Sequence, residues 1–295
     1  MPPLSLVAAR KLVCKLGWNA REWKQVLESL ASLCALEDEG HDNRPKIAAA
    51  GAIHPLVQLL GAANRVDVRG KAAVVLGCLA EYDAAIIAAA GAIPPLVQLL
   101  WDGSSAHAQG PAARALMQLA QNANNQVTIA AAGAIPALVQ LLGAGTRADV
   151  QQNAAAVLMR LASNADNQVA IAAAGAIPAL VQLLGPGSVN GVQQNAALAL
   201  ARLAKKATIA AAGAIPPLVQ LLGSSSTAAI HPAATLALAR LAKNADNTAT
   251  IAAAGAIPPL VQLALRPDSN AAVPKHAKAE MDWLRLYCGQ EDLQA

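Results

Sequence analysis

The sequence has very few aromatic residues and contains no phenylalanine. Aromatic residues make up 2% of the 295 positions, although hydrophobic residues make up 55%. The core must therefore consist of Ala, Leu, Val and Ile, which suits helices that pack closely. Proteins that bind single-stranded nucleic acids stack the bases on aromatic side chains. This composition argues against a nucleic-acid partner.

Cysteine is also scarce and is not arranged in pairs. The four cysteines are widely separated and form no Cys-x-x-Cys spacing: Cys14, Cys34, Cys78 and Cys288. This distribution favours reduced thiols in a cytoplasmic or nuclear protein. The five histidines have no metal-ligand spacing with Cys or acidic residues. We therefore expect no metal and no cofactor.

Long uninterrupted apolar runs are absent, although the mean hydropathy is +0.39. The longest apolar stretch, residues 84–101, is broken by Gly91, by the pair Pro94-Pro95 and by Gln98. A membrane-spanning helix needs about 20 consecutive apolar residues. We therefore expect no membrane insertion. The net charge of +4 is too small to indicate nucleic-acid binding by itself.

What the sequence does have is a repeat. The heptapeptide Ile-Ala-Ala-Ala-Gly-Ala-Ile occurs six times, with glycines at Gly51, Gly91, Gly133, Gly175, Gly213 and Gly255. A period close to forty residues predicts a stack of similar helical units rather than one closed globule. Such a stack offers a long surface and no enclosed pocket.

One copy, residues 167–205, predicts three helices. Asn167 is expected to cap a short helix over 168–174, and Gly175 to end it with a positive φ. The pair Ile177-Pro178 is expected to start the second helix. The third helix is predicted over about 191–205, with apolar residues at helical spacing on its buried face.

This pattern resembles the armadillo repeat. The resemblance covers about residues 43–288, through Asn-x-x-x-Ile-Ala-Ala-Ala-Gly-Ala-Ile-Pro-Ala-Leu-Val-Gln-Leu-Leu-Gly and a later Gln-Gln-Asn-Ala-Ala-x-x-Leu-x-Arg-Leu-Ala. It is most similar to the plant and algal branch of that family. HEAT repeats, the structural alternative, lack this Gly-Ala-Ile-Pro turn. The resemblance implies an all-α, right-handed superhelical solenoid of armadillo repeats.

Three regions are expected along the chain. Residues 1–42 are predicted to form an N-terminal helical cap, and residues 43–270 an array of six copies, the last beginning near 247. Residues 271–295 are predicted to form a C-terminal capping helix and tail. The tryptophans near both ends fit the cores of these caps, because terminal repeats need one polar face.

In the armadillo family the third helices line a concave groove, where a recurring Asn holds the backbone of an extended peptide and a Trp lies one turn earlier. Here the Asn position aligns with Cys78, Gln118, Arg160, Arg202, Arg240 and Arg285, and the Trp position with Val74, Arg114, Ala156, Leu198, Leu236 and Met281. Neither the recurring Asn nor the recurring Trp is present at these positions. The resemblance therefore does not imply the import-type recognition of basic peptides.

The arginines suggest a different ligand. We predict a peptide site made by Arg160, Arg202, Arg240 and Arg285, with Asn153 and Asn195 seven residues before their Arg, and Gln118 at the same repeat position. Guanidinium groups bind carboxylates and phosphates through two parallel hydrogen bonds. The expected partner is an acidic or phosphorylated extended peptide. The alternative is that each Arg only stabilises the C-terminal end of its helix, by about 0.3–1 kcal/mol.

Two other functions stay open at this stage. Plant armadillo proteins also serve as substrate-recognition regions of ubiquitin ligases, but these carry a U-box, which these 295 residues do not contain. Single-stranded nucleic-acid binding is the other alternative, and it lacks aromatic residues to stack on. We expect no enzyme: the Ser, Asp and His within residues 101–107 read as a loop, because catalytic triads come from distant positions.

Overall fold

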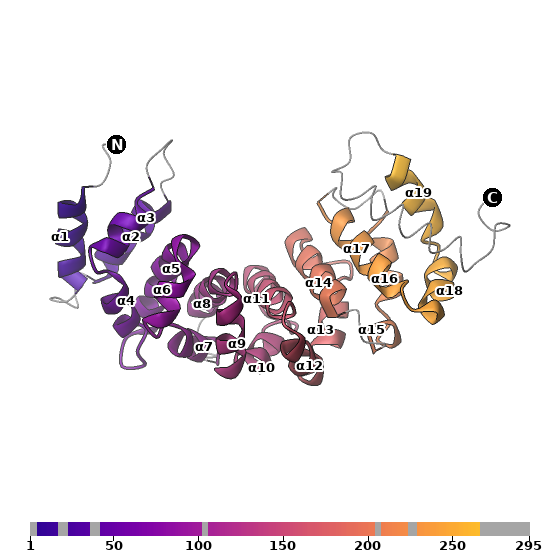
Figure 1. The fold of residues 1–295 in the computed structure, drawn as a ribbon, viewed down its shortest axis with the longest axis horizontal. Helices are drawn as coiled ribbons and strands as arrows, with labels where there is room; N and C mark the ends of the chain where they lie inside the picture. Colours follow the sequence, from indigo (N-terminus) through magenta and orange to yellow (C-terminus); the bar gives the residue numbers. More distant parts are fainter. Residues whose placement is uncertain are drawn as a thin grey trace. The chain divides into compact units, whose positions relative to one another are not determined.

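The computed structural model describes residues 5–16, 23–35, 42–101, 106–203, 208–223 and 229–265. All regular elements in these ranges are α-helices, from α1 to α19 (Figure 1). The chain divides into two compact units: unit 1 comprises Met1–Leu141 and Gly145–Asn164, and unit 2 comprises Leu142–Ala144 and Ala165–Ala295. None of the described helices is long and apolar enough to cross a membrane.

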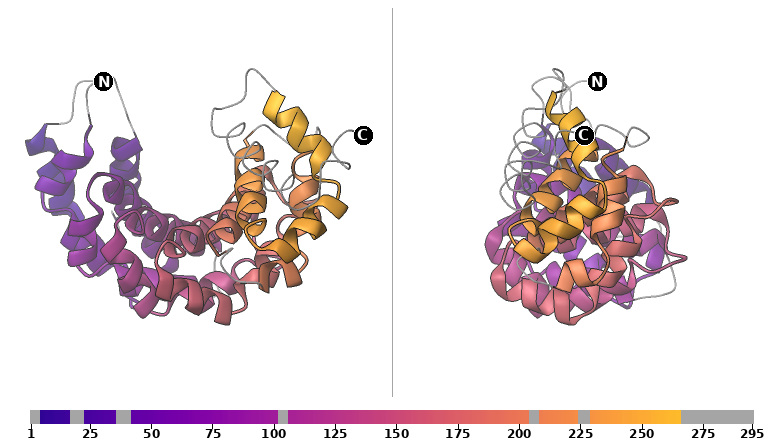
Figure 2. Two further views of the ribbon diagram at one scale, coloured as in Figure 1. Left: turned by 45° about the vertical axis from the view of Figure 1, so that its right-hand side comes forward. Right: turned by 90° about the vertical axis from the view of Figure 1, so that its right-hand side faces the viewer.

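Unit 1 begins with two helices, α1 (Leu6–Leu16) and α2 (Trp23–Ala35). Three triplets of helices follow: α3 (Arg44–Ala49), α4 (Ile53–Leu59) and α5 (Val66–Tyr82); α6 (Ala84–Ala89), α7 (Ile93–Trp101) and α8 (Ala106–Leu119); α9 (Ala123–Ala131), α10 (Ala134–Gln140) and α11 (Ala148–Leu161). The third helix of each triplet packs on the third helix of the next, α5 on α8 and α8 on α11 (Figures 1 and 2).

Unit 2 continues the triplets. It contains α12 (Ala165–Ala173), α13 (Ala176–Gln182) and α14 (Asn190–Leu203); α15 (Thr208–Ala211), α16 (Ile215–Gln220) and α17 (His231–Leu241); and α18 (Ala245–Ala253) and α19 (Ile257–Leu265). The third helices α14 and α17 again pack on each other. The predicted C-terminal cap over 271–295 lies outside the described residues.

The turn between the first and second helix of each repeat depends on glycine. Gly175 has a φ of 79°, and Gly51, Gly91, Gly133, Gly213 and Gly255 have φ values between 78° and 85°. This confirms the predicted positive φ at Gly175. L-residues with a Cβ rarely adopt this left-handed conformation, so glycine ends each first helix at little cost.

The predicted role of Asn167 as a helix cap is wrong. Asn167 is buried inside α12, which begins two residues earlier at Ala165. The matching residue in α9, Asn125, donates from Nδ2 to the carbonyls of Leu119 at 3.0 Å and Ala84 at 3.1 Å. The N-cap of α9 is Asn122, three residues earlier, whose side chain accepts from the Asn124 amide. The buried Asn therefore ties a first helix to the end of the preceding third helix.

Small residues let the third helices of unit 1 approach closely. A Cβ built on Gly70 in α5 would lie 2.9 Å from the carbonyl oxygen of His107 in α8. Ala73, Ala112 and Ala113 are completely buried in the same pair of helices. A core of Ala, Leu, Val and Ile explains how the chain folds with so few aromatic residues.

Candidate polar site along the third helices

The predicted site residues lie on neighbouring third helices within each unit. Gln118 lies on α8, and Asn153 and Arg160 lie on α11 of unit 1. Asn195 and Arg202 lie on α14, and Arg240 lies on α17 of unit 2. Arg285 lies outside the described residues. Because α8 packs on α11, and α14 on α17, the structure brings the predicted residues of each unit onto adjacent elements.

Several of these side chains hydrogen-bond to the preceding third helix. Asn153 donates from Nδ2 to the Gly110 carbonyl of α8 at 3.3 Å. Arg240 donates from a terminal guanidinium nitrogen to the Ala201 carbonyl of α14 at 2.9 Å. Ala201 lies in the last turn of α14, where carbonyls have no partner within their own helix. Each bond fixes one repeat against the previous one and also limits where the side chain can move.

Arg160 differs from Arg240, because its guanidinium lacks a partner at one buried atom. Its Nε is buried without a hydrogen bond, and none of the described carboxylates forms an ion pair with it. Burial lowers the pKa of the Arg160 guanidinium, since the protein surface removes water from the charged form. A partly buried cation without a counter-charge is costly, so this position favours an incoming anion.

Arg202 and Asn195 are both partly buried on α14. Arg202 lies in the last turn of its helix, as Arg160 and Arg240 do in theirs. The positive charge of each side chain therefore lies near the negative end of a helix dipole. This placement fits both interpretations of the arginines, the peptide site and the stabilised helix end.

A cluster around Glu81 was missed by the sequence analysis. Glu81, near the end of α5, accepts from Gln118 Nε2 at 2.6 Å and from the Arg44 guanidinium at 3.0 Å, and the Arg114 guanidinium lies 3.7 Å away. Gln121 in turn donates to Gln118 Oε1 at 2.5 Å. The predicted site residue Gln118 therefore belongs to an acid-centred network that joins α3, α5 and α8.

The signal for this cluster was present in the alignment of the repeats. The position three residues after the Asn position carries Glu81, Gln121, Ser163, Lys205 and Lys243 in successive copies. In sequence, this repeat position therefore changes from acidic to basic along the chain.

Cys78 occupies the Asn position on α5, and its thiol is only partly exposed. Burial raises the pKa of the Cys78 thiol. The neighbouring Cys34 thiol on α2 is buried, and burial raises its pKa to about 12. At neutral pH both thiols are therefore uncharged and add no negative charge to this part of the candidate site. Among the described residues, no group of three or more His, Cys, Asp and Glu could hold a metal ion.

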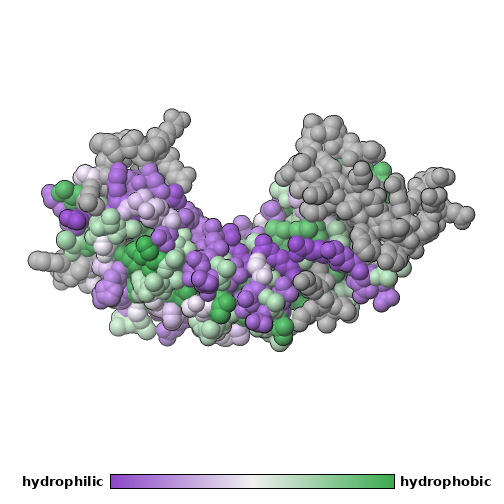
Figure 3. All heavy atoms as spheres, in the orientation of Figure 1, coloured by the Kyte–Doolittle hydropathy of each residue, from purple (hydrophilic) through white to green (hydrophobic). Residues whose placement is uncertain are grey.

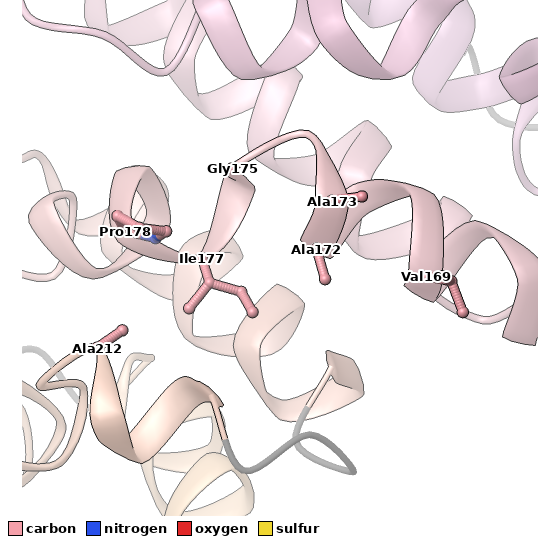
Figure 4. A pocket seen from close by; sticks show the side chains of 7 residues that line it. All are labelled: Val169, Ala172, Ala173, Gly175, Ile177, Pro178 and Ala212. Carbon is pink, nitrogen blue, oxygen red and sulfur yellow. The ribbon is translucent and has the colours of Figure 1, made fainter.

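An apolar depression of about 420 Å³ lies within unit 2, lined by Val169, Ala172, Ala173, Gly175, Ile177, Pro178 and Ala212 (Figure 4). The repeat here is shorter in sequence: Arg202 precedes Ile209 by seven residues, whereas Arg160 precedes Ile171 by eleven. The side chains here are apolar and offer no polar group to orient a ligand.

Elsewhere, the exposed large apolar residues are scattered: Val7, Tyr82, Ile86, Trp101, Val127, Val169, Val189 and Val261. On the face drawn in Figure 3, the apolar spots are separated by hydrophilic residues. Single exposed apolar residues are ordinary on protein surfaces. The third-helix side chains, which combine charge with partial burial, therefore remain the candidate site.

Comparisons with known proteins agree with the repeat pattern. Residues 122–163 and 164–205 each match the family described as Armadillo/beta-catenin-like repeat. No curated protein sequence gives a significant match to the chain.

The structure is similar to several solved structures of engineered proteins. One engineered protein is 32% identical with a TM-score of 0.73, over 79% of this chain and 98% of that one. A computationally designed armadillo repeat protein for modular peptide recognition is 29% identical with a TM-score of 0.69, over 78% and 99% of the two chains. A designed armadillo repeat protein in complex with the peptide (KR)4 is 29% identical with a TM-score of 0.68, over 79% and 99%. The glycine turn recurs in six copies, the repeats have three helices, and the chain is similar to these proteins. The chain therefore belongs to the armadillo repeat family.

Proposed function

We propose that this chain is a non-enzymatic scaffold that binds an extended, acidic or phosphorylated peptide along the third helices of its repeats. The contacts would come from Arg160, Arg202, Arg240 and Arg285, assisted by Asn153, Asn195 and Gln118. The observation that carries the proposal is Arg160, a partly buried guanidinium whose Nε has no hydrogen-bond partner and which pairs with no described carboxylate.

The positive charge of the row of arginines, Arg160, Arg202, Arg240 and Arg285, supports an anionic ligand. The designed relative solved with (KR)4 has a basic peptide as its partner. In this chain, three of the described positions that align with the family's Asn carry Arg instead. A row of guanidinium groups repels a Lys- or Arg-rich peptide and attracts carboxylates and phosphates, which Arg binds through two parallel hydrogen bonds.

The spacing of the helices suits an extended chain. Packed helices lie about 8–10 Å apart, and an extended peptide rises about 3.3 Å per residue. One repeat therefore corresponds to roughly three peptide residues. Within unit 2, Arg202 on α14 and Arg240 on α17 would contact peptide side chains about three residues apart.

The test compares two triple variants in peptide binding. Replacing Arg160, Arg202 and Arg240 by Ala should weaken the binding of an acidic peptide at least about tenfold, because a hydrogen bond to a charged group contributes about 1.5–3 kcal/mol. The matched control is Arg10→Ala, Arg65→Ala and Arg147→Ala, which removes the same charge from three exposed positions. Equal affinities for the unmodified chain and the first variant would reject the proposal.

The plant or algal origin suggested by the repeat motif stays a prediction, as does a cytoplasmic or nuclear location. The same holds for the two alternative functions, the recognition region of a ubiquitin ligase and single-stranded nucleic-acid binding. No feature of the described residues favours either alternative over the peptide site.

A further inference from the structure

The carboxylate of Glu81 places a negative charge within the candidate site of unit 1. Its Oε1 accepts from Gln118 at 2.6 Å and lies 3.7 Å from the Arg114 guanidinium, and its Oε2 accepts from Arg44 at 3.0 Å. The three partner side chains come from α3 and α8, and the carboxylate comes from α5. One carboxylate therefore engages the cations and the amide that an acidic peptide would otherwise contact here.

The next repeat has no such acid. The position that corresponds to Glu81 is Ser163, two residues after the end of α11, and Arg160 forms no ion pair with a described carboxylate. Burial lowers the pKa of the Arg160 guanidinium. The basic groups of α3 and α8 are thus paired with carboxylates of the chain itself, Arg44 with Asp42 and Glu81 and Arg114 with Glu81, while the guanidinium of α11 is not.

We propose that Glu81 is a specificity-determining residue. Its carboxylate takes the place in the first two repeats where a carboxylate of an acidic peptide would otherwise bind, so the peptide begins its contacts at Arg160. This inference rests on the proposed function and names which part of the row is closed to the ligand. Glu81 acts as an internal competitor: a peptide carboxylate that approaches Arg114 must first displace a carboxylate already held there. The peptide gains little from that exchange.

The main experiment replaces Glu81 by Gln, which keeps the shape of the side chain and its ability to accept from Gln118. The probe is a 14-residue acidic peptide, long enough at roughly three residues per repeat to pass from α11 to α5. Glu81→Gln should tighten its binding about fivefold, because a negative charge leaves the site and the Arg114 guanidinium loses its carboxylate partner, whereas Arg44 stays paired with Asp42 at 2.8 Å. The control Asp149→Asn removes an equal charge from an exposed pair with Arg147 and should change affinity less than about twofold.

An unchanged or weaker affinity of Glu81→Gln for the acidic peptide would overturn the inference. If the unmodified chain binds no acidic peptide at all, the proposed function fails instead, and the two failures are therefore distinct. A second measurement needs no variant: an acidic peptide that carries a photo-crosslinker should label α11 of the unmodified chain and leave α5 unlabelled. Labelling of α5 would overturn the inference even if Glu81→Gln did not fold.

Discussion

Single residues determine where each repeat turns. Gly133 has a φ of 81°, and a Cβ added there would have no atom within 4 Å. Any loss of stability on substitution must therefore come from the backbone conformation and not from a clash. The same glycine turn recurs in all six copies, so one position represents the others.

We predict that Gly133→Ala lowers the free energy of unfolding by about 1 kcal/mol, because an L-residue with a Cβ disfavours the left-handed region. Gly133→Asn should cost less, since Asn tolerates this region better than Ala. Urea denaturation monitored by circular dichroism would measure both. Equal losses for Ala and Asn would show that the left-handed backbone is not the cause.

Cys34 makes stability depend on pH in the alkaline range. Burial raises the pKa of its thiol to about 12, so the native state keeps a proton that the unfolded state loses from about pH 9 upward. Stability from this group is complete below that pH and falls as pH rises towards 12, by up to about 1.4 kcal/mol per pH unit. Between pH 8 and 10, Cys34→Ala should flatten the decline. Cys14→Ala, at an exposed thiol, should not, and an equal effect of both would contradict this explanation.

Elements are held together by hydrogen bonds that run from one helix to the end of another. Asn125 joins α9 to α8 through the Leu119 carbonyl, and Asn247 joins α18 to α17 through the Leu241 carbonyl at 3.0 Å. Gln109 and Gln193, on third helices, likewise donate to carbonyls at the ends of their second helices, Leu100 and Leu184. These side chains donate to carbonyls at helix ends that have no partner within their own helix, and they fix how successive helices pack.

Asn125→Ala should lower the free energy of unfolding by about 1–3 kcal/mol, because a buried and a partly buried carbonyl lose their side-chain donor. The neighbouring Asn124 is exposed on the same helix, and Asn124→Ala should change stability by less than about 0.5 kcal/mol. Thermal denaturation of the two variants beside the unmodified chain measures the difference. Similar melting temperatures for the two variants would contradict the role assigned to Asn125.

The helices and their order could be predicted from the repeat, because periodic apolar residues and the Gly-Ala-Ile-Pro turn act locally. Asn167 was misassigned because an Asn near the start of a helix can be either an N-cap or a buried residue that hydrogen-bonds to a neighbouring helix. Only tertiary contacts distinguish the two. Glu81 was missed because its function depends on Arg44 and Gln118, each 37 residues away in sequence. The sequence placed Arg160, Arg202 and Arg240 on third helices, but the donation of Arg240 to a neighbouring helix emerged only in three dimensions.

At the scale of the whole molecule, charge is graded along the repeats. The acid Glu81 engages the basic groups of the first two repeats, and the later repeats carry Arg160, Arg202 and Arg240 at the ends of their third helices. If an anionic peptide binds there, the interaction is electrostatic and weakens as salt screens it. We predict that raising the ionic strength from about 0.05 to 0.5 M weakens binding of an acidic peptide severalfold, because the Debye length shrinks over this range. An affinity that does not change with salt would contradict a site built from arginines.

The most direct test of the account measures the affinity of the unmodified chain for two peptides of equal length, one acidic and one basic, by fluorescence anisotropy at a single ionic strength. We predict that the acidic peptide binds and that the basic peptide (KR)4 does not. Preferential binding of (KR)4 would contradict it, because a row of arginines with Arg160 lacking a counter-charge would then have the wrong sign for its ligand.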